Sequence, residues 1–205
     1  IKTHTPMDGI NYAREPTYIV VYRHPIDVHF SFRTHVGNMK HDFLDYMFPE
    51  DEAEGFRRFV QAPLTDSGTD DLTAASITEH YQQARKRLGN GNIHFVHYSD
   101  LTRDLPGQVA RLAEILEIPI APDTLQEIAK ANTFAAMRSE AEQNERRFHE
   151  DSPFHDQANF FASGTSNKWE NRLGQQDLNA YDTRIASLLP PADLAWLQWG
   201  DRGAP

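Results

Sequence analysis

A short apolar run that passes directly into a proline-started helix constrains this chain more than any other feature. Residues Tyr18 to Tyr22 read YIVVY, with no polar residue among them, which predicts a β-strand buried on both faces. Strands of this kind occur in parallel sheets that are covered by helices. Pro25 suits the first position of a following helix, and Asp27 suits its first turn. The order strand, turn, helix therefore predicts an α/β fold.

Helices and strands are expected to alternate through the remaining chain. Apolar residues recur at three- and four-residue steps over 70–88, which predicts an amphipathic helix. The next β-rich run is Ile93 to Tyr98, so a βαβ arrangement follows. Further helices are predicted over 106–116, from Pro122 onward, and over 178–188, before a C-terminal apolar cluster.

Two segments are expected to lie outside regular elements. Residues 138–159 are polar and weakly periodic, which predicts a frayed helix leading into a long surface loop. Residues Phe160 to Trp169 read FFASGTSNKW, and their backbone amides could hold a phosphate, although such loops more often simply turn the chain. No repeat and no Gly-, Ser- or Pro-rich linker divides the sequence, so one domain is expected over residues 1–205.

The composition argues against several classes of function. Thirty acidic residues against 20 basic ones give a net charge of -10, and a nucleic-acid partner is not expected because duplex binding requires a basic face. The sequence has no cysteine, which rules out disulfides and cysteine-ligated metals and is typical of a reducing cytoplasm. No stretch approaches the roughly 20 apolar residues of a membrane span, so no membrane partner is expected.

Arg23 is the first candidate for ligand binding. It is predicted at the carboxyl end of a strand and beside a helix N-terminus, which is where open α/β sheets bind anions. Asp27 and Ser31 are four residues apart and share one helical face, so a guanidinium and a hydroxyl could reach one phosphate group. The alternative is a structural ion pair between Arg23 and Asp27, and the local sequence favours neither.

Histidines offer a second set of candidates. Four of them are His24, His29, His35 and His41. Their spacings do not stack ligands on one helical face, so we expect solvated or structural histidines and no metal site. His4 next to Lys2 and Thr3 combines a base that works near neutral pH with a cation, while an exposed histidine at a frayed terminus is the alternative. A Ser/His/Asp hydrolase would need a Gly-x-Ser-x-Gly turn that is absent here.

Taken in order, five segments resemble blocks of the cytosolic-type sulfotransferase family. They are IKTHTP at 1–6, YIVVYRHPIDVHFSF at 18–32, VHYSDL at 96–101, ANTFAAM at 131–137 and FFASGTSNKW at 160–169. The resemblance implies a parallel central sheet flanked by helices, similar to that of P-loop nucleotide hydrolases. It also implies transfer of a sulfuryl group from 3'-phosphoadenosine 5'-phosphosulfate (PAPS) to the hydroxyl or amine of a small-molecule acceptor. The product would be 3',5'-adenosine bisphosphate (PAP), and no metal is required.

The resemblance assigns roles residue by residue. His4 would be the general base, with Lys2 near the transferring sulfuryl group. Arg23 and Ser31 would bind the 3'-phosphate of the cofactor. The remaining cofactor-binding residues would be Tyr98, Asn132 and Phe134 around the adenine, and Ser163 and Gly164 on the 3'-phosphate side.

Three departures from the family pattern qualify these roles. The Gly-rich loop that holds the 5'-phosphosulfate is missing from the sequence, and we expect it in a βα unit before Ile1. Ala162-Ser163-Gly164 stands where the family has Arg-Lys-Gly, so backbone amides or another arginine must replace two cations. The dimer motif of the family is not matched over 170–179, which leaves the oligomeric state open.

Two other functions fit the same fold. A nucleotide-dependent kinase would need a phosphate-loop lysine and a magnesium-binding carboxylate after a strand, and no persuasive carboxylate is present. A non-catalytic nucleotide-binding protein would have lost the donor loop. The acceptor itself is not readable from the sequence, because such pockets are built from variable loops; residues 35–49 and 138–159 are the segments expected to face it.

Overall fold

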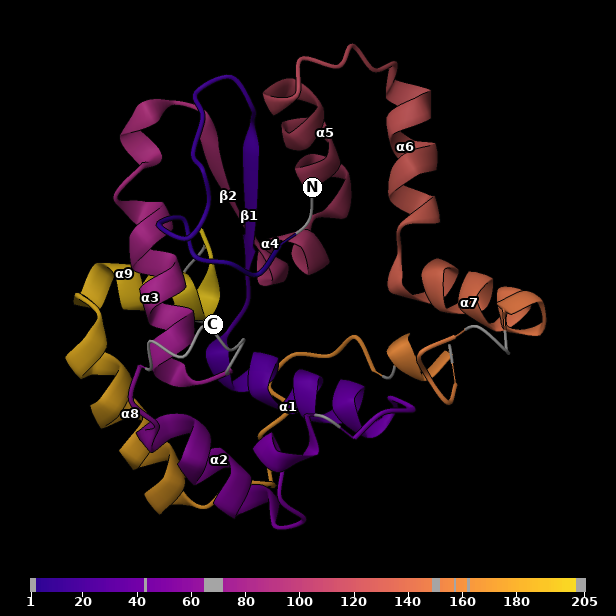
Figure 1. The fold of residues 1–205 in the computed structure, drawn as a ribbon. Helices are drawn as coiled ribbons and strands as arrows, with labels where there is room; N and C mark the ends of the chain where they lie inside the picture. The colour runs from indigo at the N-terminus through magenta and orange to yellow at the C-terminus, as the bar shows by residue number, and fades with distance from the viewer. Residues whose placement is uncertain are drawn as a thin grey trace.

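A two-stranded parallel sheet lies at the centre of the molecule (Figure 1). The computed structural model describes residues 3–42, 44–64, 72–148, 152–156, 158–161 and 163–201, and of residues 144–148 only the backbone. Strand β1 (Tyr18–Tyr22) pairs with β2 (Ile93–His97) in parallel, with Tyr18 opposite Ile93 and Tyr22 opposite His97. The parallel pairing predicted from the sequence is confirmed.

Helices surround this sheet. In chain order they are α1 (Pro25–Gly37), α2 (Glu52–Gln61), α3 (Ala74–Arg85), α4 (Tyr98–Arg103), α5 (Leu105–Ile115), α6 (Pro122–Ala131), α7 (Phe134–Phe148), α8 (Gln175–Leu188) and α9 (Pro191–Trp199). Three short 3-10 turns, η1 (Asp45–Met47), η2 (Leu88–Asn90) and η3 (Ala158–Phe161), lie between them. Figure 1 shows α3, α8 and α9 on one side of the sheet, α5 and α6 on the other, and α1 and α2 below. None of the described helices is both long and apolar enough to cross a membrane.

Local sequence explains where the key helices begin. Pro25 occupies the first turn of α1, and the side chain of His24 caps the helix by accepting a hydrogen bond from the amide of Ile26 at 3.3 Å. Helix α3 begins with a reciprocal capping box, in which Thr73 and Ser76 each accept from the other's backbone amide at 2.9 Å. Both starts confirm the predicted helices.

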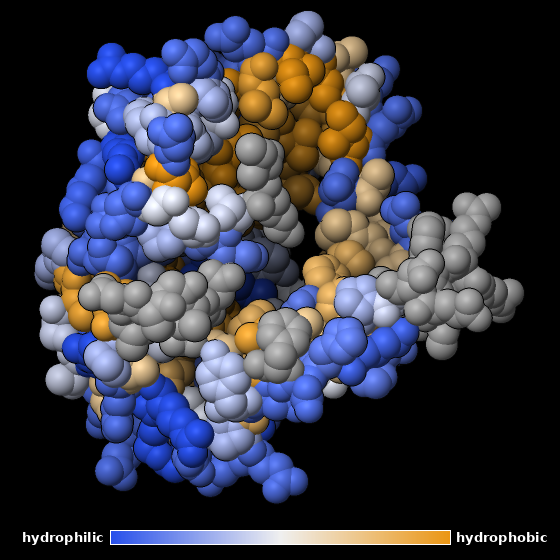
Figure 2. Space-filling view, in the orientation of Figure 1, coloured by the Kyte–Doolittle hydropathy of each residue, from blue (hydrophilic) through white to orange (hydrophobic). Residues whose placement is uncertain are grey.

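The expectation that β1 is buried on both faces is wrong. Tyr18, Val20 and Tyr22 pack into the core with α3 and α9, whereas Ile19 and Val21 on the other face are 38% and 59% exposed. Figure 2 shows an apolar surface in this region, where Figure 1 places β1, β2 and α5. The described residues cover this face of β1 incompletely, so an apolar run that is typical of a two-sided strand is buried on one side.

Some helices differ from the sequence prediction. Residues 138–159 were expected to form a frayed helix leading into a long surface loop, and helix α7 is regular from Phe134 to Phe148. The second strand was predicted to reach Tyr98, but it ends at His97, and Tyr98 begins α4, which was not predicted. Helix α2 was not predicted, yet its signal is present: Asp51 caps the helix by accepting from the amides of Ala53 and Glu54 at 2.9 and 3.0 Å. The apolar residues Phe56, Phe59 and Val60 follow at helical spacing and are buried.

Candidate active site

Arg23 lies at the carboxyl end of β1 and faces the segment 163–169. Its Nη2 atom donates to the carbonyl oxygen of Thr165 at 2.5 Å and lies 3.6 Å from Oδ2 of Asp27. The guanidinium carbon lies 4.1 Å from the centre of the Tyr98 ring, a distance typical of a cation–π contact. Arg23 thus joins the ends of both strands to α1 and to the glycine-containing loop.

One donor of the Arg23 guanidinium is buried and has no partner among the described residues. The side chain of Arg23 is 15% exposed, and its Nε atom is buried without a hydrogen-bond partner among the described residues. A buried donor left unpaired costs about 1–3 kcal/mol, and an anionic group bound beside Arg23 would satisfy it. The ion pair between Arg23 and Asp27 is therefore present, and it leaves the Nε donor unused.

Asp27 anchors the loop to α1. The residue is 1% exposed, and its carboxylate accepts hydrogen bonds from the backbone amides of Asn167 and Lys168 at 3.2 and 2.9 Å. Ser31 follows one turn later on the same helical face and is half-buried. The shared face of Asp27 and Ser31 predicted from their spacing is thus present, and the loop lies against the Asp27 end of it.

Gly164 meets two of the residues assigned to the adenine. The hydroxyl of Tyr98 donates to the carbonyl oxygen of Gly164 at 3.1 Å. The backbone of Gly164 has φ +61°, and a Cβ atom there would lie 2.4 Å from Cδ2 of Phe134. Only glycine meets both conditions. Ser163 is exposed, and its Oγ accepts from the hydroxyl of Thr165 at 3.2 Å. Arg23, Tyr98, Phe134 and Gly164 are therefore in one cluster.

Asn132 is less clearly part of this cluster. It caps the C-terminus of α6, is exposed, and donates its side-chain amide to the carbonyl of Ile128 in its own helix at 2.8 Å. Its position two residues before Phe134 brings its backbone near the site, while its amide satisfies the helix end. The predicted residue Lys2 lies outside the described residues, and so does Ala162, where the sequence departs from the family pattern.

Lys168 is a candidate that sequence reasoning missed. It is half-buried in the loop, and its pKa is lowered by burial first and then by the charge of Arg23, while Asp27 opposes the shift. Arg23 forms an ion pair with Asp27, and the charge of Asp27 also acts on Lys168, in a protein of net charge -10. The signal in the sequence was a lysine next to Trp169, a few residues after the Ala162-Ser163-Gly164 departure.

The predicted base, His4, is exposed. Burial first, and then the charge of His4, lower the pKa of His80 on α3. Arg23, the residue after β1, donates to the loop at Thr165, whereas the hydroxyl of Tyr22, the last residue of β1, lies 2.9 Å from Nδ1 of His80.

The buried histidines have structural roles, as expected. His24 packs 4.4 Å from Trp169 between ring centres, and burial, with the nearby charges of His97 and Arg23, lowers its pKa to about 3. His29 is 1% exposed among Phe30, Phe56 and Phe59. Across the described ranges, no group of three or more histidine, aspartate or glutamate side chains could hold a metal ion.

Comparisons with a family model and with known proteins identify the same family. The sulfotransferase domain matches residues 1–190. A glycolipid sulfotransferase of Mycobacterium bovis is 30% identical over 230 residues, which cover 99% of this chain and 70% of the relative. Sulfotransferase 6B1 of Danio rerio is 24% identical, with 92% of this chain and 57% of the relative covered.

Solved structures share the fold. Mouse sulfotransferase SULT7A1 complexed with PAP superposes with a TM-score of 0.69 at 16% identity, covering 87% of this chain and 60% of that one. Retinol dehydratase in complex with retinol and PAP gives a TM-score of 0.68 at 20% identity, covering 85% of this chain and 48% of that one. The chain therefore spans between about half and two thirds of these structures.

Proposed function

This chain belongs to the sulfotransferase domain family, and from that premise we propose that the protein transfers a sulfuryl group from PAPS to the hydroxyl or amine of a small-molecule acceptor. Membership confirms the family, the enzyme class and the α/β fold expected from the sequence. The observation that carries the proposal is the position of Arg23 at the strand end. Its Nε atom is a buried donor without a partner among the described residues, and the loop beside it requires glycine at position 164.

The 3'-phosphate is proposed to bind between Arg23, Ser31 and the loop. Arg23 offers Nε, Ser31 offers a hydroxyl on the Asp27 face of α1, and Ser163 and Gly164 offer backbone and hydroxyl groups. We add Lys168 as the cation that compensates for the Arg-Lys pair missing at 162–163, because burial and Arg23 both destabilise its charge. A bound phosphate would stabilise the charged form of Lys168.

The adenine is proposed to lie near Tyr98, Asn132 and Phe134. Tyr98 and Phe134 both contact Gly164, so the proposed base and phosphate regions share one wall. Aromatic faces suit a purine because they combine apolar area with favourable ring stacking. The two solved relatives bound to PAP support this choice of nucleotide.

His4 is proposed to remove the proton of the acceptor hydroxyl, with Lys2 neutralising charge near the sulfuryl group. PAPS supplies the sulfuryl group, and PAP leaves. His4 is exposed, as a base that must reach an incoming acceptor should be. The names of the relatives, a glycolipid sulfotransferase and a retinol-binding dehydratase, favour an acceptor with a large apolar part.

We propose that the loop for the 5'-phosphosulfate belongs to a βα unit outside the given sequence, within one domain. The exposed Ile19 and Val21 support this, because they form an apolar face on a strand that pairs only with β2 in the described structure. The whole protein should bind less of a hydrophobic dye than this chain alone. Equal dye binding by the whole protein and by this chain would contradict the proposal that the βα unit covers this apolar face. The cytoplasmic location stays a prediction.

Calorimetry with PAP tests the proposed function. Arg23→Ala should weaken PAP binding by about 2–3 kcal/mol, the value of a hydrogen bond to a charged group in a poorly solvated site. Arg58→Ala is the matched control, since Arg58 forms an exposed ion pair with Glu54 on α2 and should leave affinity unchanged. Equal affinity in wild type and Arg23→Ala would refute the phosphate site, and preference for ATP with Mg²⁺ would favour the kinase alternative.

Turnover in His4→Ala tests the base. We expect PAP affinity to be retained and turnover to fall by about 10²- to 10⁴-fold, which is the usual contribution of a general base. His94→Ala, a half-buried histidine on β2, serves as a control for the loss of an imidazole. Unchanged turnover in His4→Ala would remove His4 from the reaction.

A further inference from the structure

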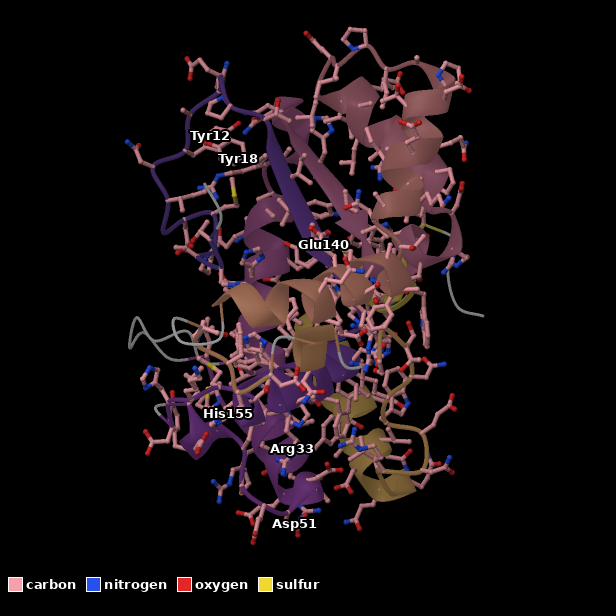
Figure 3. All side chains as sticks on the ribbon, turned by 90° about the vertical axis from the view of Figure 1, so that its right-hand side faces the viewer. Tyr12, Tyr18, Arg33, Asp51, Glu140 and His155 are labelled. Atoms are coloured by element: carbon pink, nitrogen blue, oxygen red, sulfur yellow. The ribbon has the colours of Figure 1, made fainter. Side chains whose placement is uncertain are left out.

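A fork of two hydrogen bonds joins α2 to the segment that follows the glycine-containing loop. Arg172 donates from Nε to Oε2 of Glu52 at 2.9 Å and from Nη2 to Oε1 of the same carboxylate. Arg33 on α1 approaches Oε1 of Glu52 at 3.7 Å and donates to the carbonyl oxygen of Glu50 at 3.0 Å. Figure 3 shows Arg33 near Asp51, the cap residue directly before Glu52. One carboxylate therefore connects α2, α1 and the loop segment.

This ion pair differs from a simple surface pair. Single exposed ion pairs contribute little, whereas forked geometry and additional charges make a pair count. The guanidinium carbon of Arg172 also lies 4.2 Å from the centre of the Phe30 ring, and Phe30 is fully buried on α1. Arg172 is thus held by a carboxylate from α2 and by an aromatic face from α1.

The backbone between the loop and Arg172 consists of successive turns. The amide of Glu170 donates to the carbonyl of Asn167 at 3.1 Å, and the amide of Arg172 donates to the carbonyl of Trp169 at 3.0 Å. Asn167 and Asn171 have φ +58° and +63°, a conformation that asparagine adopts more readily than most residues. Because these turns leave little freedom, the position of Arg172 constrains the backbone at Asn167.

The same segment lies along the part of α1 that carries the proposed phosphate contacts. Asp27 accepts hydrogen bonds from the backbone amides of 167–168 at 3.2 and 2.9 Å. One turn further along α1, Phe30 lies against Arg172, and Ser31 is the next residue. The segment is therefore attached to α1 at two points, and the fork with α2 secures the second of them.

We propose that Glu52 and Arg172 are positioning residues for the 3'-phosphate site: their fork holds the segment 167–172 against α1 and so fixes the loop backbone and Lys168 where the phosphate binds. The inference rests on the proposed function, since the 3'-phosphate site is part of it. A loop held in its binding conformation loses less freedom when the ligand binds, which raises affinity. Neither residue is placed at the reacting atoms, so turnover at saturating PAPS should stay at the wild-type value.

A comparison of two nucleotides tests the proposal in the whole protein. PAP carries the 3'-phosphate, and adenosine 5'-monophosphate (AMP) lacks it. We expect Glu52→Gln and Arg172→Met each to weaken PAP about three- to tenfold, as the loss of a charged contact that orders a binding loop does, and to leave AMP affinity unchanged. Methionine keeps an apolar chain over Phe30. The double variant should lose no more than Arg172→Met alone, because both changes break one fork.

Asp177→Asn is the matched control. Arg57 on α2 lies 3.3 Å from Asp177 on α8, so this variant breaks another ion pair between α2 and a later segment. It should keep the wild-type ratio of PAP to AMP affinity. Arg172→Lys keeps the charge and loses the fork, so it should lie between wild type and Arg172→Met. A lower free energy of unfolding with an unchanged ratio in Glu52→Gln and Arg172→Met would mean a purely structural role and would overturn the inference.

Hydrogen exchange of the loop amides gives a readout without a nucleotide. The amides of Asn167 and Lys168 should exchange faster in Arg172→Met than in wild type or Asp177→Asn, because the segment opens more often. Unchanged exchange would overturn the positioning role. If Arg23→Ala weakens PAP while Glu52→Gln and Arg172→Met do not, this inference fails and the proposed function stands. If PAP affinity is unchanged in Arg23→Ala, the phosphate site and this inference fail together.

Discussion

Replacement of Gly164 by alanine should disrupt the proposed nucleotide site through two separate physical effects. The backbone of Gly164 has φ +61°, and a left-handed conformation costs a residue with a Cβ atom roughly 1–2 kcal/mol. The new methyl group would also lie 2.4 Å from Cδ2 of Phe134, and overpacking of this kind costs about 1–3 kcal/mol. Together the two effects oppose the present loop by roughly 2–5 kcal/mol.

This cost should appear in binding, because its relief requires the loop or the ring of Phe134 to move, and both belong to the proposed nucleotide site. Since each 1.4 kcal/mol is tenfold in affinity, we expect Gly164→Ala to weaken PAP by about 30-fold or more, measured by calorimetry. Two other glycines separate the backbone effect from the steric effect. Gly91 has φ +81° and Gly37 has no positive φ, and an added Cβ at either position would have no atom within 4 Å.

The two controls have different expected outcomes. Gly91→Ala should lower the free energy of unfolding by about 1–2 kcal/mol through its backbone alone and leave PAP affinity unchanged. Gly37→Ala, within α1, should be neutral or slightly stabilising, because alanine is the better helix former. Wild-type PAP affinity in Gly164→Ala, or equal weakening in Gly91→Ala, would refute the assignment of this loop to the nucleotide site.

Two further predictions concern stability. Asp27→Ala leaves two backbone amides without the carboxylate that accepts from them, so urea denaturation should show a free energy of unfolding lower by about 2–4 kcal/mol. Asp51→Ala removes an exposed helix cap and should cost only about 1 kcal/mol. A larger loss in Asp51→Ala than in Asp27→Ala would contradict the anchoring role of Asp27. Burial, with smaller effects of Arg33 and Arg172, lowers the pKa of His29 from 6.5 to about 4. The unfolded state therefore binds more protons than the folded state below pH 6.5, so the free energy of unfolding falls as the pH drops toward 4. His29→Phe should remove about 2 kcal/mol of the loss between pH 7.5 and pH 5, and an unchanged pH dependence would exclude His29 as its source.

Short-range features of the chain were predictable to within a few residues. Strand β1 was predicted at 18–22, where it occurs, because apolar β-branched and aromatic residues favour extended backbone. The start of α1 follows from Pro25, whose ring fixes φ at a helical value. The family blocks also located Arg23, Tyr98, Phe134 and Gly164, which the structure places in contact.

Other features depended on partners that the local sequence does not reveal. The exposure of Ile19 and Val21 is decided by what covers the sheet, so an apolar run could not show that one face is open. Lys168 became a candidate only because the loop returns over Arg23. Figure 3 shows Arg33 and Asp51 at the opposite end of the molecule from Tyr12 and Tyr18, a separation that no local pattern in the sequence encodes.

The sequence by itself determined the types of chemistry present: an arginine that follows a strand, a glycine within a polar loop, and a histidine able to accept a proton. Backbone preference and side-chain chemistry belong to each residue and its near neighbours, so they can be predicted without the fold. Only the tertiary structure decided which groups meet. Arg23 contacts Thr165 across 142 residues, and Tyr22 contacts His80 across 58. Such contacts depend on how all the apolar faces pack together, because no local rule fixes the distance between segments that are far apart in the chain.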